Sequence, residues 1–308
     1  MDIKNVVVVG AGMMGNSLAQ VFAADPELVV RLKTRELKPD RFEPIEKNLD
    51  VMVQSGAMTN DEKNAILGRI IFVTDDADAY ADADFIIECY PEVMETKQDL
   101  FKHIENFCRD DCILATNTSV MSPTEISEKC KHRERVVGAH FWNPGHLIPL
   151  VEVVKSDFTT EGVMQDTMDL LTRVGKKPVY CKKDVPGFVA NRLQHALWRE
   201  AFYMVQEGIA DPAAVDDACK YGPGLRWPVL GPMENSDMVG IELSFNIQDY
   251  VLKSLADNHE PTPLLKEMLG RGELGMKSGK GWQEWTPEQT AASSRNLKEY
   301  LIDYNTKK

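Results

Sequence analysis

A glycine-rich turn near the start of the chain constrains the fold more than any other feature. Its sequence is Gly10-Ala11-Gly12-Met13-Met14-Gly15, between an apolar β-branched run at residues 5–9 and a helical pattern that ends near residue 24. In such a strand–turn–helix unit, glycines allow a tight turn, a close approach of the backbone to a pyrophosphate, and close packing of helix on strand. Unpaired N–H groups at the start of the helix favour phosphate. We therefore predict a dinucleotide site formed by Gly10, Gly12, Met13, Met14 and Gly15.

The end of the second predicted strand bears on which dinucleotide binds. An acidic residue in this place usually bonds the ribose of NAD, whereas a nearby arginine accommodates the additional phosphate of NADP. Here the strand ends Lys33-Thr34-Arg35, and the first acid is Glu36. Lys33 and Arg35 suit a 2′-phosphate, whereas Thr34 or Glu36 could serve an NAD ribose. The predicted cofactor is therefore NAD or NADP.

Short apolar strands alternate with helical patterns over the first 185 residues. This alternation predicts an α/β domain with a doubly wound, mostly parallel sheet of the Rossmann type. The pattern changes at Asp184-Val185-Pro186-Gly187, after which a long amphipathic helix and further helical segments follow without a convincing strand. We expect a dinucleotide-binding domain at residues 1–185 and an all-helical domain at residues 186–308, which would bind substrate and form dimers.

Composition excludes several classes of partner. The formal net charge is −13 and the pI is about 5.0, so binding to nucleic acid or to an anionic membrane is not expected. No apolar run approaches the roughly 18 residues of a membrane span. The six cysteines form no Cys-x-x-Cys pair and are interpreted as reduced thiols. With no signal-peptide pattern at the start of the sequence, a cytoplasmic protein without a metal site is expected.

His140 and Glu152 form a candidate catalytic pair. His140 ends an apolar strand and precedes an Asn-Pro turn, and Glu152 is a single acid in a second apolar strand. Burying a carboxylate is costly unless it is paired, and an imidazole is a natural partner. Such a glutamate would hold the histidine tautomer and support the imidazolium formed during proton transfer.

Seven stretches in the same order resemble the 3-hydroxyacyl-CoA dehydrogenase family over roughly residues 3–285. They are Val-Val-Gly-Ala-Gly-Met-Met-Gly (8–15), Ile-Ile-Glu-Cys-Tyr-Pro-Glu (86–92), Thr-Asn-Thr-Ser (116–119), His-Phe-Trp-Asn-Pro (140–144), Leu-Val-Glu-Val (150–153), Asp-Val-Pro-Gly-Phe-Val-Ala-Asn-Arg (184–192) and Lys-Ser-Gly-Lys-Gly (277–281). The resemblance implies NAD(P)-dependent oxidation of a hydroxyl group β to a carboxyl or thioester group. It also implies a homodimer formed through the helical domain.

The same resemblance implies roles for individual residues. His140 would be the general base and Glu152 would orient it, while Ser119 and Asn191 would hold the substrate oxygen and Asn143 would line the same pocket. The resemblance places Glu92 and Lys97 near the nicotinamide-side ribose and ring. It also implies that Lys277 reaches the cofactor from the helical domain. From the residues alone, Ser119 could instead cap the following helix, and Lys97 could be a solvated helix charge.

Two departures from the family pattern concern the substrate. Residues 49–58 contain no Lys or Arg, although members that use CoA typically carry lysines there. In addition, Ile-Pro-Leu-Val-Glu (148–152) and Gly-Leu-Arg-Trp (224–227) look more like the branch containing lambda-crystallin (gulonate dehydrogenase) and carnitine dehydrogenase. Arg226 could then face a substrate carboxylate or form a surface salt bridge.

These departures favour a small free 3-hydroxy or 3-oxo acid, with a 3-hydroxyacyl-CoA thioester as the alternative. A catalytically silent, crystallin-like structural protein and a dehydrogenase of another Rossmann family with a lysine base are the remaining alternatives. The complete set of His140, Glu152, Ser119 and Asn191 argues against the structural role, and the His-Phe-Trp-Asn-Pro stretch argues against a lysine base.

Overall fold

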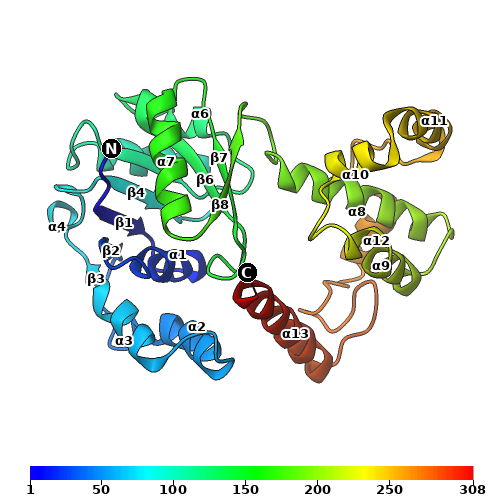
Figure 1. The fold of residues 1–308 in the computed structure, drawn as a ribbon, viewed down its shortest axis with the longest axis horizontal. Coiled ribbons are helices and arrows are strands. Elements are labelled where there is room, and N and C mark those ends of the chain that lie inside the picture. The colour runs from blue at the N-terminus through cyan, green and yellow to red at the C-terminus, as the bar shows by residue number, and fades with distance from the viewer. Residues whose placement is uncertain (308) are drawn as a thin grey trace. The chain divides into compact units, whose positions relative to one another are not determined.

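An eight-stranded, mostly parallel sheet forms the centre of the first part of the chain in the computed structural model, which describes residues 1–307 (Figure 1). The strand order is β3-β2-β1-β4-β5-β6-β7-β8, and only the β6–β7 pair is antiparallel. The predicted doubly wound sheet is therefore confirmed. The strands are β1 (Asn5–Val9), β2 (Val29–Lys33), β3 (Ile70–Val73), β4 (Phe85–Glu88), β5 (Ile113–Thr116), β6 (Val136–Phe141), β7 (Leu150–Val154) and β8 (Lys177–Cys181).

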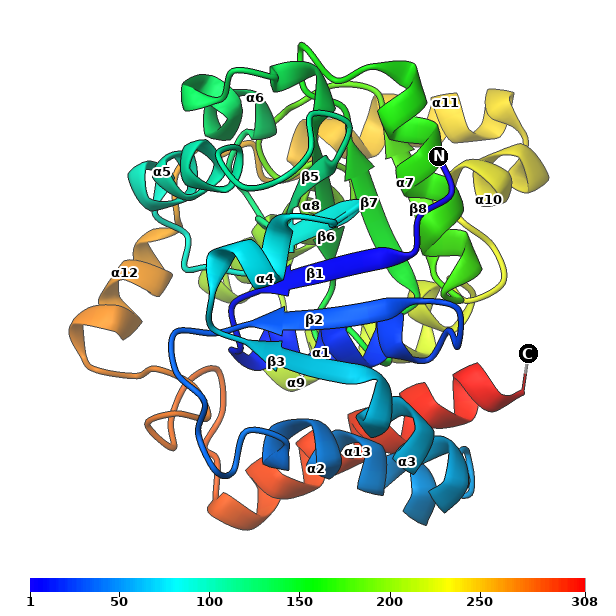
Figure 2. The ribbon, with the colours of Figure 1, turned by 90° about the vertical axis from the view of Figure 1, so that its left-hand side faces the viewer.

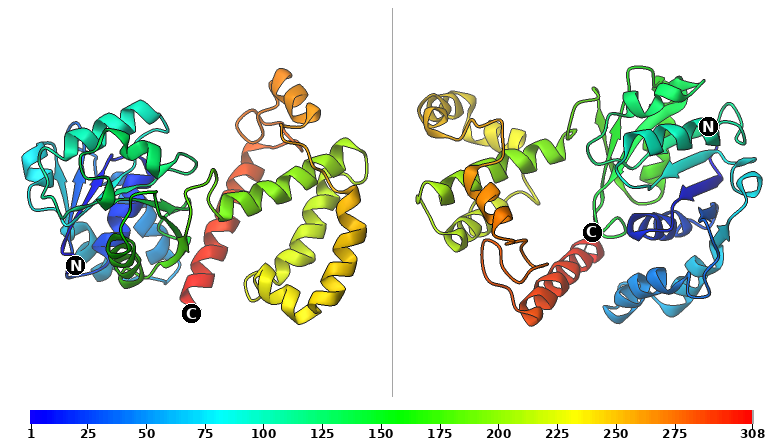
Figure 3. Two further views of the ribbon diagram at one scale, coloured as in Figure 1. Left: turned by 90° about the horizontal axis from the view of Figure 1, so that it is seen from above. Right: turned by 180° about the vertical axis from the view of Figure 1, so that it is seen from behind.

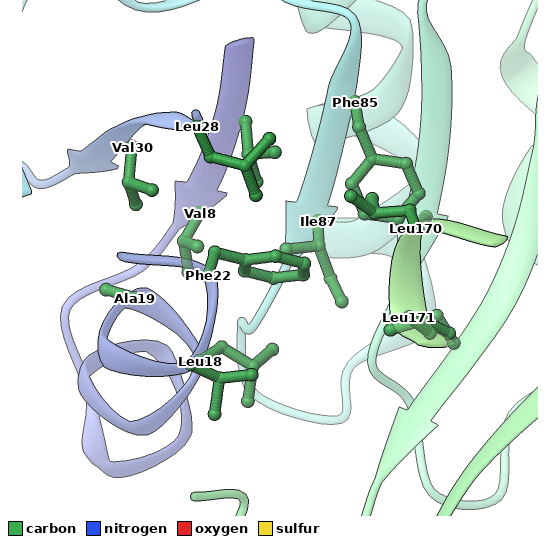
Figure 4. Close-up of a cluster of buried hydrophobic side chains, with 14 of the residues drawn as sticks. Val8, Leu18, Ala19, Phe22, Leu28, Val30, Phe85, Ile87, Leu170 and Leu171 are labelled. Carbon is green, nitrogen blue, oxygen red and sulfur yellow. The ribbon is translucent and has the colours of Figure 1, made fainter. Parts of the chain in front are cut away.

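Helices cover both faces of this sheet, and β1 shows why. Its side chains alternate between the faces: Val6 and Val8 belong to one buried cluster, Val7 and Val9 to another. The first cluster contains side chains of α1 (Met13–Ala23), α2 (Glu43–Gln54), α3 (Asn60–Arg69) and α7 (Glu161–Arg173), and Figure 4 shows part of it around Phe22 and Leu171. The second contains side chains of α4 (Asp76–Tyr80), α5 (Met94–Ile104) and α6 (Pro123–Ile126).

The strand order reverses between β1 and β4, which are adjacent parallel strands: the chain first adds strands on one side of β1 and then on the other. To one side of β1 lie β2 and β3, which Figure 2 shows side by side with it, and to the other lie β4 and β5. Ligands of open α/β sheets bind at the carboxyl ends of the strands at such a switch point. Residues that follow Val9 and Glu88 are therefore placed at the edge where a ligand would bind.

The turn after β1 uses two of its glycines for steric reasons. Gly10 has φ +107°, a conformation that L side chains rarely adopt. Gly15, inside α1, packs so tightly that a Cβ atom there would lie 1.7 Å from the carbonyl oxygen of Gly10. At Gly12, by contrast, an added Cβ would meet no atom within 4 Å.

The chain forms two compact units: Met1–Arg192 with the chain from Asn296 onward, and Leu193–Arg295. The latter contains helices and isolated bridges but no extended strand (Figure 3). The end of the last helix, from Asn296, belongs to the first unit. The division expected from the sequence, at residue 185, assigns these residues to the second domain. The helices that follow β8 are α8 (Ala190–Gln206), α9 (Pro212–Tyr221), α10 (Pro232–Val239), α11 (Ile241–Val251), α12 (Pro263–Gly270) and α13 (Pro287–Thr306).

Short 3-10 helices complete the secondary structure at Ser127–Lys129, Arg133–Arg135, Pro223–Leu225 and Leu252–Ser254. Within residues 1–307, no helix combines the length and the apolar character that crossing a membrane requires.

The glycine turn generates a stability prediction. We expect Gly15→Ala to lower the free energy of unfolding by at least about 2 kcal/mol, because the new methyl group would collide with backbone and not with a movable side chain. Gly12→Ala is the matched control and should unfold at nearly the wild-type temperature. Thermal unfolding followed by circular dichroism would test both, and equal melting temperatures for the two variants would contradict the packing role of Gly15.

Candidate active site

A cavity of about 730 Å³ opens at the carboxyl ends of β1 and β4. One wall is the glycine turn, including Gly10, Gly12, Met13 and Met14, and another is the segment Cys89-Tyr90-Pro91 after β4. The third wall follows β2 and includes Lys33 and Arg35. The structure thus brings the turn and the end of β2 together around one space. Gly15 is buried behind the turn.

The start of α1 fits the phosphates of a dinucleotide. Met13 is the first residue of this helix, and Gly12 at its N-cap offers no side chain to satisfy the free N–H groups. These groups therefore remain available to an anion. The open space beside Gly12 allows the close backbone approach that the turn requires. The donor set and the cavity thus suit a dinucleotide cofactor.

His140 and Glu152 are directly opposite each other on the antiparallel strands β6 and β7. Side chains of such a pair lie on the same face of the sheet. The His140 Nδ1 atom is 2.8 Å from Glu152 Oε2, and both residues are buried, at 5% and 0% exposure. The predicted pairing of these two side chains is thus present in the structure.

The Glu152 carboxylate accepts four hydrogen bonds in all. Besides His140, the Trp142 Nε1–H group donates to Oε2 at 3.1 Å, and the backbone N–H groups of Val189 and Ala190 each donate to Oε1 at 2.8 Å. Burial raises the pKa of the Glu152 carboxyl, but the hydrogen bonds outweigh burial, and the pKa lies below the ordinary value of 4.5. Glu152 is therefore ionised at neutral pH. The His140 Nδ1 atom then carries the proton that Glu152 accepts, which leaves Nε2 to act as a base.

A left-handed turn aims the two backbone donors at Glu152. Gly187 has φ +76° and Phe188 has φ +49°, the latter unusual for a residue with a side chain. The Phe188 ring is 2% exposed, and its centroid lies 5.9 Å from that of His140. Successive N–H groups after such a turn form an anion-binding concavity. Sequence reasoning missed the roles of Phe188, Val189 and Trp142, although the stretch Pro186-Gly187-Phe188 was a signal.

Ser119 and Asn191 meet at the start of α8. The Asn191 Nδ2 atom donates to the Ser119 backbone oxygen at 3.1 Å. Glu92 fixes the turn that carries Ser119, because its carboxylate accepts hydrogen bonds from the Ser119 N–H group at 2.6 Å and from Thr118 Oγ1 at 2.8 Å. Ser119, Asn191 and Glu92 are therefore connected, and their contacts with substrate or cofactor stay predictions.

Lys97 belongs to a buried network beneath the strand ends. It is 1% exposed, and its amine lies 2.6 Å from Glu88 Oε1 and 3.2 Å from the Tyr90 carbonyl. Glu88 also accepts hydrogen bonds from Thr116 Oγ1 and from the Tyr90 N–H group. Lys97 is thus neither a solvated surface charge nor an open wall of the cavity, and its closeness to the cofactor stays a prediction.

The loop that carries Asn143 is fixed by residues the sequence did not single out. The buried Lys176 amine donates to the carbonyls of Gly145 and Ile148, and burial lowers its pKa to about 8. Ser17 Oγ accepts the His146 N–H group at 3.0 Å. Asn143 itself is exposed.

The remaining predicted residues lie in the second unit. Arg226 and Lys277 are both exposed there, and their roles toward substrate and cofactor stay predictions. Among residues 1–307, no group of three or more His, Cys, Asp or Glu residues could hold a metal ion.

Comparison with known proteins identifies two family domains. Residues 5–185 match the NAD-binding domain of 3-hydroxyacyl-CoA dehydrogenase, and residues 187–285 match the C-terminal domain of the same family. Together they cover nearly the whole chain. The chain thus contains an NAD-binding domain.

Relatives match along most of their length. A 5-formyl-3-hydroxy-2-methylpyridine 4-carboxylate 5-dehydrogenase of Mesorhizobium japonicum is 33% identical over 94% of this chain and 93% of its own. The crystal structure of an NAD⁺-dependent dismutase of that name has a TM-score of 0.87, at 32% identity and coverage of 98% and 97% of the two chains.

Two further relatives widen the range of named substrates. Human mitochondrial hydroxyacyl-coenzyme A dehydrogenase is 33% identical over 92% of this chain and 91% of its own. L-Carnitine dehydrogenase of Oceanobacillus iheyensis is 35% identical over 77% and 76% of the two chains. With both family domains matched in order, the chain belongs to the 3-hydroxyacyl-CoA dehydrogenase family.

Proposed function

We propose that this dehydrogenase of the 3-hydroxyacyl-CoA dehydrogenase type interconverts a free 3-hydroxy acid and its 3-oxo acid, with His140 as the general base. The observation that carries the proposal is the buried His140–Glu152 pair, in which an ionised carboxylate holds the imidazole Nδ1 atom at 2.8 Å. A structural role would not require this pair together with a dinucleotide cavity at the same edge of the sheet.

In the oxidising direction, His140 Nε2 accepts the proton of the substrate hydroxyl group, and Glu152 stabilises the imidazolium that results. The bound nicotinamide cofactor supplies the hydride chemistry. Ser119 and Asn191 hold the substrate oxygen, while Asn143 lines the substrate side. In the reducing direction His140 returns the proton to the oxygen.

The charges on α2 and α3 support a free acid over a CoA thioester. Lys47 lies 2.6 Å from Glu43, Lys63 pairs with Asp50, and Arg69 Nε donates to the Ala23 carbonyl at 2.7 Å. Lys63 and Arg69 are thus engaged by the protein, and Lys47 is left as a single exposed cation in a weak surface pair. CoA carries several phosphates that need cationic partners. Two of the relatives are named for a carboxylate and for L-carnitine, not for a CoA thioester.

We also propose a homodimer through α10 and α11. Monomers rarely expose large contiguous apolar patches, yet Phe245 is 69% and Tyr250 82% exposed. Neither helix has a buried residue. The other large exposed apolar side chains of the two helices are Met233, Met238, Val239, Ile241, Leu243, Ile247 and Val251. We further propose a cytoplasmic location, because all six cysteines are unpaired and disulfides are rare in cytosolic proteins.

Substitutions in the pair test the mechanism. His140→Ala should lower kcat by about 100-fold or more, the scale of a lost general base. Glu152→Gln should lower kcat strongly as well, because an amide that donates to Nδ1 would reverse the tautomer and block Nε2. Steady-state rates would measure both, with cofactor dissociation constants as the control for folding. Near-wild-type turnover of His140→Ala would contradict the mechanism.

Substrate choice is tested by initial reduction rates on free 3-oxo acids, including acetoacetate and dehydrocarnitine, and on acetoacetyl-CoA. We expect kcat/KM to be higher for a free acid, and Lys63→Ala to leave the rates on acids unchanged. A high kcat/KM for acetoacetyl-CoA that falls in Lys63→Ala would contradict the free-acid proposal. Cofactor binding without turnover of any substrate would favour the silent structural alternative.

The dimer proposal predicts that Phe245→Asp, which places a charge in the apolar patch, halves the solution mass measured by light scattering. The exposed Leu37→Asp, on the first unit, is the control and should keep the wild-type mass. A wild-type protein that is monomeric at micromolar concentration would contradict the proposal.

A further inference from the structure

The wall of the dinucleotide cavity that follows β2 lacks the carboxylate that usually bonds an NAD ribose. The first residue after the strand is Thr34, whose backbone N–H donates to Val73 and whose hydroxyl donates to the Glu36 carbonyl at 3.2 Å. In this fold the adenosine ribose is bound at the end of the second strand, where an acid accepts its 2′-hydroxyl group. A threonine there carries no charge to repel a phosphate.

Lys33 and Glu36 are each occupied by another residue. The Lys33 amine lies 3.0 Å from Asp76 and 2.5 Å from the Thr74 carbonyl. The Glu36 carboxylate lies 3.3 Å from the Lys38 amine. The Lys33 amine is therefore bound by residues of the β3–α4 connection. The charge of Glu36 is partly neutralised by Lys38.

Arg35 is the cation left free on this wall. It lines the cavity and is exposed, and among residues 1–307 it has no ion pair or side-chain hydrogen bond. A guanidinium group matches the geometry of a phosphate and can bind it through two hydrogen bonds.

A second arginine supports the same wall. The guanidinium of Arg41 lies over the rings of Phe42 and Phe72, at 5.4 Å and 5.7 Å from their centroids. Its Nη1 group donates to the Lys38 carbonyl at 3.3 Å, while its buried Nε–H group has no partner among the described residues. Arg41 is thus held in place with a donor unused.

The local balance of charge differs from that of the whole molecule. The wall after β2 contains the cations Lys33, Arg35, Lys38 and Arg41 and the acids Glu36, Asp40 and Glu43, in a chain with a net charge of −13. Glu43 is also paired, with Lys47. With these paired groups set aside, Arg35 and Arg41 remain on this wall against one acid, Asp40, so the balance of charge there is positive.

We propose that this site selects the 2′-phosphorylated cofactor, NADP(H), over NAD(H), with Arg35 as the residue that binds the phosphate and Arg41 as its support. The inference rests on the proposed function and sharpens it. It departs from the family description as an NAD-binding domain, and its basis is that no acid stands at Lys33, Thr34 or Arg35, where β2 ends, while Arg35 is free.

Nucleotide binding without substrate tests the inference. Dissociation constants of NADPH and NADH would be measured by fluorescence titration for the wild-type chain, Arg35→Ala and Thr34→Asp, with Lys102→Ala on α5 as a matched loss of one exposed cation. We expect the wild type to bind NADPH at least about tenfold more tightly than NADH, since hydrogen bonds to charged groups are among the stronger ones. This preference should fall with ionic strength, because the phosphate contact is exposed.

The variants separate the roles of the two residues. Arg35→Ala should lose most of the preference by weakening NADPH alone, Thr34→Asp should reverse it, and Lys102→Ala should change neither constant. Equal or tighter binding of NADH by the wild type would overturn the inference while leaving the proposed function intact. Binding of neither nucleotide would overturn both.

Discussion

The buried Glu152 carboxylate is the interaction on which the site depends. It joins three elements that are distant in sequence: β6 through His140, its own strand β7, and the start of α8 through the N–H groups of Val189 and Ala190. An ionised group at 0% exposure is costly unless hydrogen bonds satisfy it fully. Four donors do so here, and the same donors keep the carboxylate charged. Loss of any one element would leave a charge buried without its partners.

Parallel strands bring the rest of the site to the same edge of the sheet. The glycine turn follows β1, the Glu88 network ends β4, and the turn with Ser119 follows β5. Only the β6–β7 pair is antiparallel, and this exception makes His140 and Glu152 cross-strand neighbours. The topology thus supplies the cavity at the strand ends, while one antiparallel pair supplies the His140–Glu152 contact to which we assign the acid–base chemistry.

Much of this arrangement could be predicted from the sequence, because the signals were local. The run Val6–Val9 and the glycine turn identify a buried strand and a helix start. Single polar residues in apolar strands make His140 and Glu152 candidates, and the family resemblance then selects them. Non-local partners could not be predicted. No local sequence pattern indicates that Lys97 is buried in an ion pair with Glu88. Likewise, none indicates that Lys33 pairs with Asp76. The left-handed conformation of Phe188 depends on tertiary packing that no pattern encodes.

The central claim is that Glu152 fixes the tautomer of His140, and NMR spectroscopy of the ring nitrogens tests it most directly. In ¹⁵N-labelled protein, with His140→Gln used to assign the signals, we predict that Nδ1 carries the proton donated to Glu152 and that Nε2 has a free lone pair. In Glu152→Gln the proton should move to Nε2. A wild-type ring protonated at Nε2 would contradict the account, because that nitrogen could not then accept the proton of a substrate hydroxyl group.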